Sequence, residues 1–220
     1  MLQFVNDHQL FNRPNRFLIG VDYGMQNDNR QRFNNNFGVR DTLNLSQIER
    51  VQSVGPFFRN EWNMLDKLDL VMGGRWDWLH YQVKDAFKTD GNQSGSRTVA
   101  QASGSIGLVY HLTEQQQIYT HVASVFEAPT TTELLNNPAG RGGFNPRLNA
   151  QTSLSNELGI RGNTAGFQYD TAVFFIRTWD EITPFELPSS PGRAIFRNAG
   201  QSRRLGVETR LATPEWKGLR

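Results

Sequence analysis

The stretch of residues 68–83, LDLVMGGRWDWLHYQV, limits the possible fold more than any other part of the chain. Its even positions from 68 to 78 hold apolar residues or glycine, whereas Asp69, Arg75 and Asp77 occupy odd positions. Because side chains alternate across a β-strand, the pattern predicts a strand with one apolar and one charged face. A tilted strand crosses a bilayer with about 9–11 residues, and this one is long enough. Its apolar face must therefore meet either a protein core or lipid.

Similar alternation recurs along the chain and predicts an all-β, antiparallel meander of about eight strands. Besides 68–83, the predicted strands cover residues 17–23, 55–62, 99–112, 118–126, 154–160, 167–175 and 205–211. Short turns are predicted at 63–67, 113–116 and 163–166, and long polar loops at 25–53, 84–97, 127–149 and around Pro184, Pro188, Pro191 and Gly192. The segment 25–53 is rich in Asn, Arg and Gln, too polar for a core and too long for an ordinary connection.

Long loops and short turns thus alternate strictly. This is typical of an outer-membrane barrel, which has short periplasmic turns and long extracellular loops. A soluble β-sandwich has no reason to sort its connections in this way, although it stays the alternative on the pattern alone.

Composition excludes several other classes of protein. The mean hydropathy of −0.56 is compatible with a barrel, whose lumen is polar, and the absence of a long apolar run excludes a helical membrane protein. With no cysteine, the chain has no disulfide scaffold, thiolate metal site or cysteine nucleophile. The net charge of +2, with bases and acids interleaved, argues against a nucleic-acid partner.

No catalytic arrangement emerges, and we expect neither an enzyme nor a bound metal or other cofactor. The histidines, His8, His80, His111 and His121, lack the spacing of a metal site. Glu157 and Arg161 share one face of a predicted strand, as do Arg204, Glu208 and Arg210. Carboxylates beside arginines suit ion pairs lining a lumen better than the paired carboxylates of a glycosidase.

Several linked motifs closely resemble the barrel domain of TonB-dependent outer-membrane receptors, over residues 17–213. They are E-W at 61–62, L-x-L-x-x-G-x-R-W-D at 68–77, F-x-x-P-T with E-L at 126–134, N-P-x-L at 145–148, E-x-G-x-R-G at 157–162 and N-A-G-x-x-R-x-x-G-x-E at 198–208. The chain departs from the family at Ala150–Gln151, where Pro-Glu is common, which affects local loop geometry.

The resemblance implies a transmembrane barrel of about 22 strands, plugged by an N-terminal domain that carries the TonB box. Neither the plug nor the box is visible in the sequence, so we expect residues 1–220 to be one partial barrel domain, an internal piece of a receptor in the bacterial outer membrane. The implied partners are the TonB complex, through the missing plug domain, outer-membrane lipid and lipopolysaccharide, and a small-molecule ligand.

The implied function is active uptake of a scarce ligand, and the preferred candidate for this ligand is a ferric siderophore. The alternatives are the same receptor class importing haem, a vitamin or an oligosaccharide, and a passive, eight-stranded porin-type barrel. Trp76 and Trp78 are expected at the outer membrane interface, with His80 and Tyr81 just beyond them.

The expected ligand-binding residues are aromatic and basic residues in the long loops and upper lumen. Arginine offers bidentate, permanently charged donors to a carboxylate or catecholate chelate, and aromatic faces stack on flat ligands. The candidates are Trp78, His80, Tyr81, Arg141, Phe144, Arg147, Phe185, Arg193 and Arg197.

Overall fold

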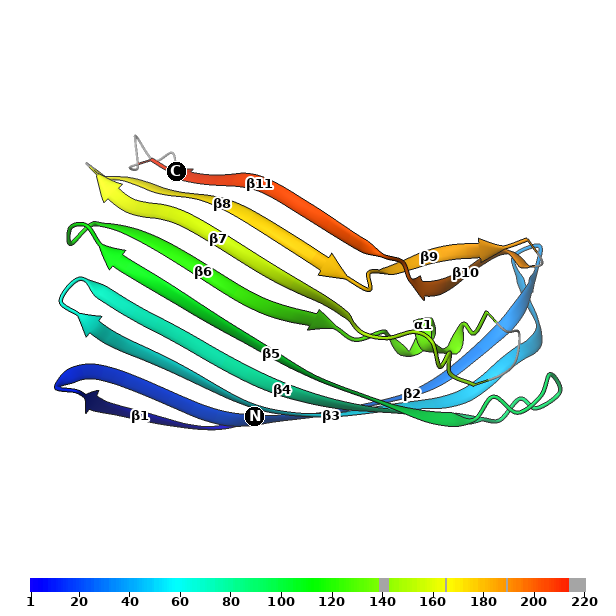
Figure 1. Cartoon of the computed structure of the whole chain (residues 1–220). Coiled ribbons are helices and arrows are strands. Elements are labelled where there is room, and N and C mark those ends of the chain that lie inside the picture. Colours follow the sequence, from blue (N-terminus) through cyan, green and yellow to red (C-terminus); the bar gives the residue numbers. More distant parts are fainter. Residues whose placement is uncertain (139–142, 165, 189, 214–220) are drawn as a thin grey trace.

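The chain forms one long antiparallel sheet of nine strands in a computed structural model that describes residues 1–138, 143–164, 166–188 and 190–213, with the backbone alone at 190–193. The strands lie in the order β1-β2-β3-β4-β5-β6-β7-β8-β11, so that nearly every strand pairs with its neighbour in sequence (Figure 1). The predicted all-β meander is confirmed.

The sheet strands are β1 (Leu2–Leu10), β2 (Arg13–Asn36), β3 (Val39–Leu65), β4 (Leu68–Asp85), β5 (Gly95–His111), β6 (Gln116–Glu127), β7 (Gln151–Thr164), β8 (Phe167–Trp179) and β11 (Gln201–Ala212). A helix, α1 (Thr131–Leu135), follows β6, and β9 (Ile182–Leu187) pairs with β10 (Ser190–Asn198) in a separate hairpin. Each of the eight predicted strands matches a strand of the sheet, with 99–112 extending one residue past β5, whereas β1, β9 and β10 correspond to no predicted strand. Within the described ranges, no helix combines the length and hydropathy that crossing a membrane requires.

Short and long connections gather at opposite ends of the sheet (Figure 1). Two-residue connections join β1 to β2 and β3 to β4, and short turns join β5 to β6 and β7 to β8. The β4–β5 connection, the loop 128–150 with α1, and the β9–β10 hairpin lie at the other end. The predicted sorting of the connections is confirmed except between β2 and β3, which a two-residue turn joins at the end of the long connections.

The segment 25–53 is strand and not loop, which corrects the prediction. β2 and β3 are the longest strands and meet in a turn at Phe37–Gly38, and we call residues 24–53 the arm. Because β4 pairs with β3 as far as Gln47, only the outer part of the arm is two-stranded. Polar side chains bond across it, as from Arg32 Nε to Asn44 Oδ1 at 2.9 Å. The outer part at 32–45 is largely exposed and needs no apolar face, and nearer the sheet the arm buries the polar residues Gln47 and Glu49. Its strands therefore show no regular hydrophobic period.

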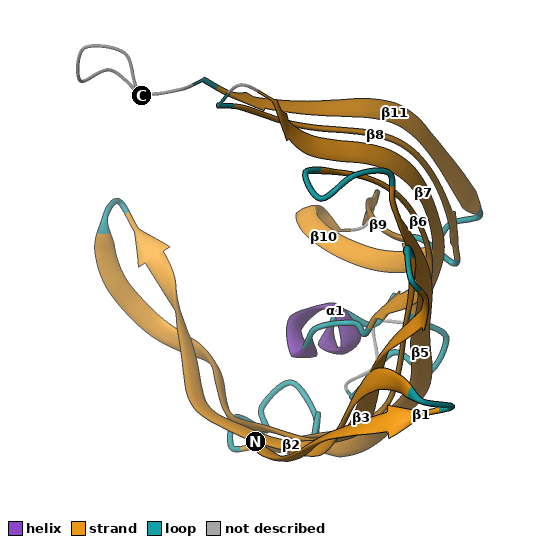
Figure 2. Ribbon diagram, turned by 90° about the vertical axis from the view of Figure 1, so that its left-hand side faces the viewer, coloured by secondary structure: helices purple, strands orange, loops and turns teal. Residues whose placement is uncertain are grey.

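The sheet curves into an open trough, with α1 and the β9–β10 hairpin inside the curve (Figure 2). β1 and β11 lie at its opposite edges and pair with β2 and β8, not with each other. The eight-stranded closed barrel considered above is therefore not what this chain forms.

The two faces of the trough differ as the pattern of β4 predicts. Large apolar side chains are exposed on the convex face, including Ile106 and Leu158, at 50% and 58% of their surface. On the concave face, Arg75 bonds Asp22 at 2.6 Å and Asp77 at 2.7 Å. By register and alternation, every acidic residue in the described strands of the nine-stranded sheet lies on the concave face, apart from the arm tip at 32–45.

Glycines in the strands face aromatic residues on the neighbouring strand. The directly opposed pairs are Gly20 and Phe57, Gly74 and Phe58, Gly159 and Tyr119, and Gly206 and Phe174. A Cβ atom built on Gly159 would lie 2.4 Å from Tyr119 Cζ, and one on Gly206 would lie 2.5 Å from Phe174 Cζ. Each ring thus covers the backbone of its glycine, which explains why the motifs at 157–162 and 198–208 contain a glycine.

Candidate functional site

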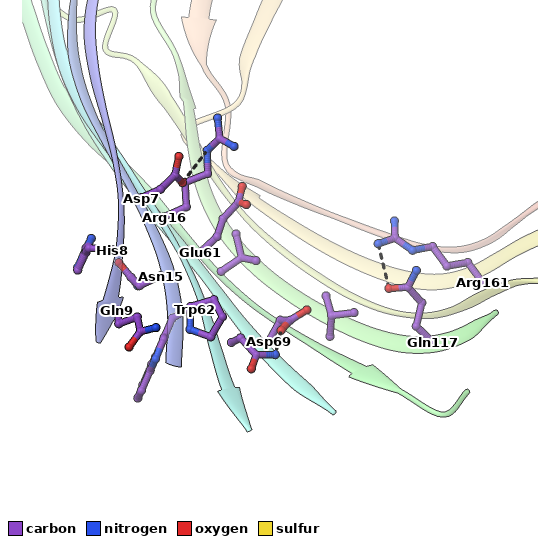
Figure 3. A pocket seen from close by; sticks show the side chains of 14 residues that line it. Asp7, His8, Gln9, Asn15, Arg16, Glu61, Trp62, Asp69, Gln117 and Arg161 are labelled. Carbon is purple, nitrogen blue, oxygen red and sulfur yellow. Dashed lines mark hydrogen bonds and ion pairs between the residues drawn. The ribbon is translucent and has the colours of Figure 1, made fainter. Parts of the chain in front are cut away.

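The concave face near the short turns carries many polar and charged side chains. Figure 3 shows a pocket there in which Arg16 lies beside Asp7 and Arg161 beside Gln117. The expected pairing of Arg161 with Glu157 is not what forms: Arg161 donates to Gln117 at 3.4 Å and lies over the Tyr119 ring at 5.2 Å. Most charges here have a partner on the same wall, so this region is suited to line a lumen.

A second pocket, which we call the upper pocket, lies between the arm and the loop 128–150. It is lined by Gln26, Asp28, Asn29, Arg30, Gln31, Glu49, Val51, Leu79, Tyr81 and residues 128–132. Its volume of about 730 Å³ is in the range of small-molecule sites.

Arg30 is the central cation of the upper pocket. Its Nη1 donates to Glu49 Oε1 at 3.2 Å and to Thr132 Oγ1 at 3.0 Å. Glu49 is buried and also accepts a hydrogen bond of 2.6 Å from Gln47. Asp28, on the same wall, is exposed. The pocket therefore offers an anchored guanidinium together with amide and carboxylate groups.

Helix α1 forms the wall opposite the arm, and its own residues fix its start. Thr130 and Glu133 make a capping box, in which Thr130 N donates to Glu133 Oε2 at 2.7 Å. Leu134 is fully buried beside Tyr81 and Leu148. Burial, and secondarily the nearby Glu133, raise the pKa of Tyr81. Tyr81 is thus a neutral packing residue beneath the loop.

Two asparagines fasten the loop 128–150. Asn145 N donates to the Leu134 carbonyl at 2.6 Å, and the Asn145 carbonyl accepts from Arg97 on β5. Asn198 accepts from Asn149 N at 2.7 Å and donates to the Asp180 carbonyl at 2.6 Å. These are the asparagines of the N-P-x-L and N-A-G motifs, whose role as loop anchors sequence reasoning missed.

The departure from the family at Ala150–Gln151 also has a structural role. Gln151 Nε2 donates to Glu127 on β6 at 2.8 Å, and its Oε1 accepts from Ile182 N at 2.9 Å. One side chain therefore links β6, β7 and the base of the β9–β10 hairpin.

The predicted ligand residues separate into three groups. Trp78 and His80 lie on the convex face and stack on each other, with ring centroids 5.6 Å apart, so they are remote from the concave pockets. Tyr81 is buried on the concave face. Phe144 packs against the buried cluster of Tyr81, Leu134 and Leu148. Alternation along β4 separates His80 from Tyr81, although they are adjacent in sequence.

The remaining predicted residues belong to the long connections. Arg147 and Arg197 are exposed, and the Arg197 guanidinium lies 4.9 Å from the centre of the Phe185 ring. Arg141 lies outside the described residues, as does the side chain of Arg193. Among these residues of the long connections, Phe185 and Arg197 are brought together. In the part of the chain that the structure describes, no cluster of His, Asp and Glu could hold a metal ion.

Known proteins share this architecture. The family model described as "TonB dependent receptor-like, beta-barrel" matches residues 2–220. Among solved structures, the ferric-catecholate import receptor Fiu from E. coli K12 aligns with a TM-score of 0.66 and 13% identity, over 96% of this chain and 34% of that one. The ferric citrate transporter FecA aligns with a TM-score of 0.75 and 12% identity, over 94% of this chain and 30% of FecA.

A third similar structure is the copper transporter OprC, with a TM-score of 0.68 and 14% identity over 98% of this chain and 35% of OprC. The chain therefore spans about a third of the length of these structures. At such low identity the structures establish the shared fold, while the family match covers almost all of the sequence. The open trough, its sorted connections and that match together show that the chain belongs to the TonB-dependent receptor β-barrel family.

Proposed function

We propose that this chain forms part of the wall and outer loops of a bacterial outer-membrane receptor that binds a ferric siderophore and imports it actively. The convex face would meet lipid, and the concave face would line the lumen. The observation that carries the proposal is the upper pocket, which the arm and the loop 128–150 enclose inside the trough, at the end where the long connections gather.

The side chains at the end of the sheet where the long connections gather are suited to bind an oxygen-rich metal chelate. Arg30 is held in the upper pocket by Glu49 and Thr132, and the Phe185–Arg197 pair presents a ring with a guanidinium. Guanidinium groups bind carboxylates and catecholates through paired hydrogen bonds, and rings stack on flat ligand surfaces. Uptake would depend on the TonB complex, acting through a plug domain.

The similar structures favour an iron chelate as the cargo and leave a second cargo open. Fiu and FecA are named for ferric-catecholate and ferric citrate, and OprC for copper. A binding test must therefore include a copper salt beside the ferric chelates.

The test is titration of the full-length receptor with ferric catecholate, ferric citrate, haem, vitamin B12 and copper(II), followed by TonB-dependent uptake in iron-starved cells. We expect tight binding of one ferric chelate, and Arg197→Ala should weaken it about tenfold through loss of a charged hydrogen bond. Lys88→Ala, in the exposed β4–β5 connection, is the matched control and should leave the affinity unchanged. Binding of copper or haem in place of all ferric chelates would contradict the proposed cargo.

A further inference from the structure

Asn156 on β7 places a carboxamide among apolar residues on the convex face. Its register partners are Val122 on β6 and Phe175 on β8, which are 37% and 39% exposed on that face. The next convex residues along β7, Leu154 and Leu158, are exposed as well. Because β7 has a paired strand on each side, the surroundings of Asn156 do not depend on either edge of the sheet (Figure 1).

In the proposed membrane location, Asn156 lies at the depth of the hydrocarbon layer. On the convex face of β8, Tyr169 and Trp179 mark the two interfacial levels, where aromatic residues gather. Their register partners on β7 are Gly162 and Thr152. Asn156 is six positions from Gly162 and four from Thr152. Since a tilted strand crosses the layer with about 9–11 residues, Asn156 is near its middle.

The hydroxyl groups beside Asn156 on β6 are satisfied within the sheet. Thr120 Oγ1 donates to the Glu157 carbonyl at 3.0 Å. Ser124 Oγ donates to the Gly104 carbonyl at 3.4 Å. The Asn156 side chain, in contrast, forms no hydrogen bond with any residue that the structure describes. Because an amide without a hydrogen bond is costly in hydrocarbon, this carboxamide calls for a polar partner inside the membrane.

The surfaces on the two sides of β7 differ in shape. On the β8 side, the large Phe175 ring is exposed. On the β6 side, Thr120 and Ser124 are small and exposed on either side of Val122. Gly104 on β5, opposite Ser124, has no side chain. A two-fold axis along the membrane normal, next to β7, brings β8 of one copy opposite β6 of the other, so that each ring meets small residues.

We propose that a second copy of the receptor packs against this convex face, with the two Asn156 side chains bonded to each other inside the membrane. A carboxamide carries N–H donors and a carbonyl acceptor, so two of them related by a two-fold axis can form two reciprocal hydrogen bonds. Lipid chains offer neither group at this depth. The inference rests on the proposed outer-membrane location and not on the identity of the imported ligand.

The experiment measures energy transfer between donor-labelled and acceptor-labelled copies of the full-length receptor in vesicles of phosphatidylethanolamine and phosphatidylglycerol, as the protein is diluted with lipid. Asn156→Leu should weaken dimerisation about tenfold, on the scale of side-chain hydrogen bonds within membranes. Asn156→Gln keeps the carboxamide and should retain most of the transfer. Asn60→Leu makes the same change on the convex face of β3, two residues from Trp62, and should leave dimerisation unchanged.

The gel-mobility shift of the folded barrel confirms that each variant is folded, and leucine on the lipid-facing side should not weaken the fold. Absence of energy transfer at every dilution, or equal losses for Asn156→Leu and Asn60→Leu, would overturn the dimer. Binding of ferric chelates is measured in the same vesicles. A receptor that binds its chelate but stays monomeric contradicts the dimer alone, and one that dimerises but binds no ferric chelate contradicts the proposed cargo alone.

Discussion

Arg30 on the arm and Thr132 on α1 are 102 positions apart in the chain, and a hydrogen bond of 3.0 Å joins Arg30 Nη1 to Thr132 Oγ1. The bond crosses the upper pocket and ties the arm to the loop 128–150. The two walls of the pocket are therefore coupled through a polar contact, beside the apolar packing of Val51 against the buried cluster of Tyr81, Leu134 and Leu148.

Thr132→Val removes the acceptor while keeping the shape of the side chain. We expect amide exchange in residues 131–135 to become about tenfold faster, since one hydrogen bond to a charged group is lost. Hydrogen-exchange mass spectrometry on the full receptor measures this. Thr131→Val, at the neighbouring position, is the control, and an equal change there would show that the helix and not the Arg30 bond sets the exchange rate.

Ile106→Arg tests which face of the sheet meets lipid. Ile106 is half exposed on the convex face, so arginine there should lower the free energy of unfolding in lipid vesicles by about 2–4 kcal/mol. Ser105→Arg places the same side chain on the concave face and should cost much less. Equal losses for the two variants would contradict the assignment of the faces.

Acid should loosen the base of the β9–β10 hairpin. The nearby Ser202 hydroxyl, and then Arg204, which donates to Glu181 Oε1 at 2.7 Å, hold the pKa of Glu181 below its usual 4.5. A carboxylate with a lowered folded-state pKa stabilises the fold fully above pH 4.5, and this contribution is lost as pH falls through the folded-state value.

Limited proteolysis of the hairpin across this pH range measures the effect. Glu181→Gln should remove most of the pH dependence in residues 182–198. Glu114→Gln, in a short turn at the other end of the sheet, should leave the profile unchanged. A wild-type hairpin equally resistant at every pH would show that Glu181 does not fasten it.

Gly159→Ala should disturb the lumen wall. The added methyl group would force the Tyr119 ring aside and away from Asp170, to which its hydroxyl donates at 3.0 Å. We expect a loss of about 1–3 kcal/mol in the free energy of unfolding, the usual cost of overpacking. Gly95→Ala, whose methyl group would meet Phe144 at an ordinary 3.7 Å, is the control. The loss should shrink when Tyr119 is also replaced by alanine.

Strands that contact two different media could be predicted from the sequence. β4 has lipid-compatible residues on one side and Asp69, Arg75 and Asp77 on the other, so its period of two was visible and its faces are confirmed. The outer part of the arm is largely exposed, and Arg32 and Asn44 bond across it without a hydrophobic period in the sequence. β1 was missed as well.

The candidate site was harder to predict, because composition identifies useful residue types but not the face on which they lie. His80 and Tyr81 were proposed together, yet one side chain is outside the trough and the other is buried beneath a loop. Arg30 is one of several arginines in the polar segment 25–53, and nothing in the sequence distinguishes it from Arg32 or Arg40. The anchoring role of Asn145 depends on contacts with Leu134 and Phe196, which no local pattern shows.

The glycines opposed by aromatic rings have a consequence for how such chains diverge. When a ring occupies the space over a glycine, substitutions at the two positions depend on each other. A side chain at the glycine would displace the ring, and loss of the ring would expose the glycine backbone. Gly159 with Tyr119 and Gly206 with Phe174 should therefore change together between distant relatives. Comparing such residue pairs across neighbouring strands should then detect homology between sequences whose identity is near 13%, where comparison of single positions is weak.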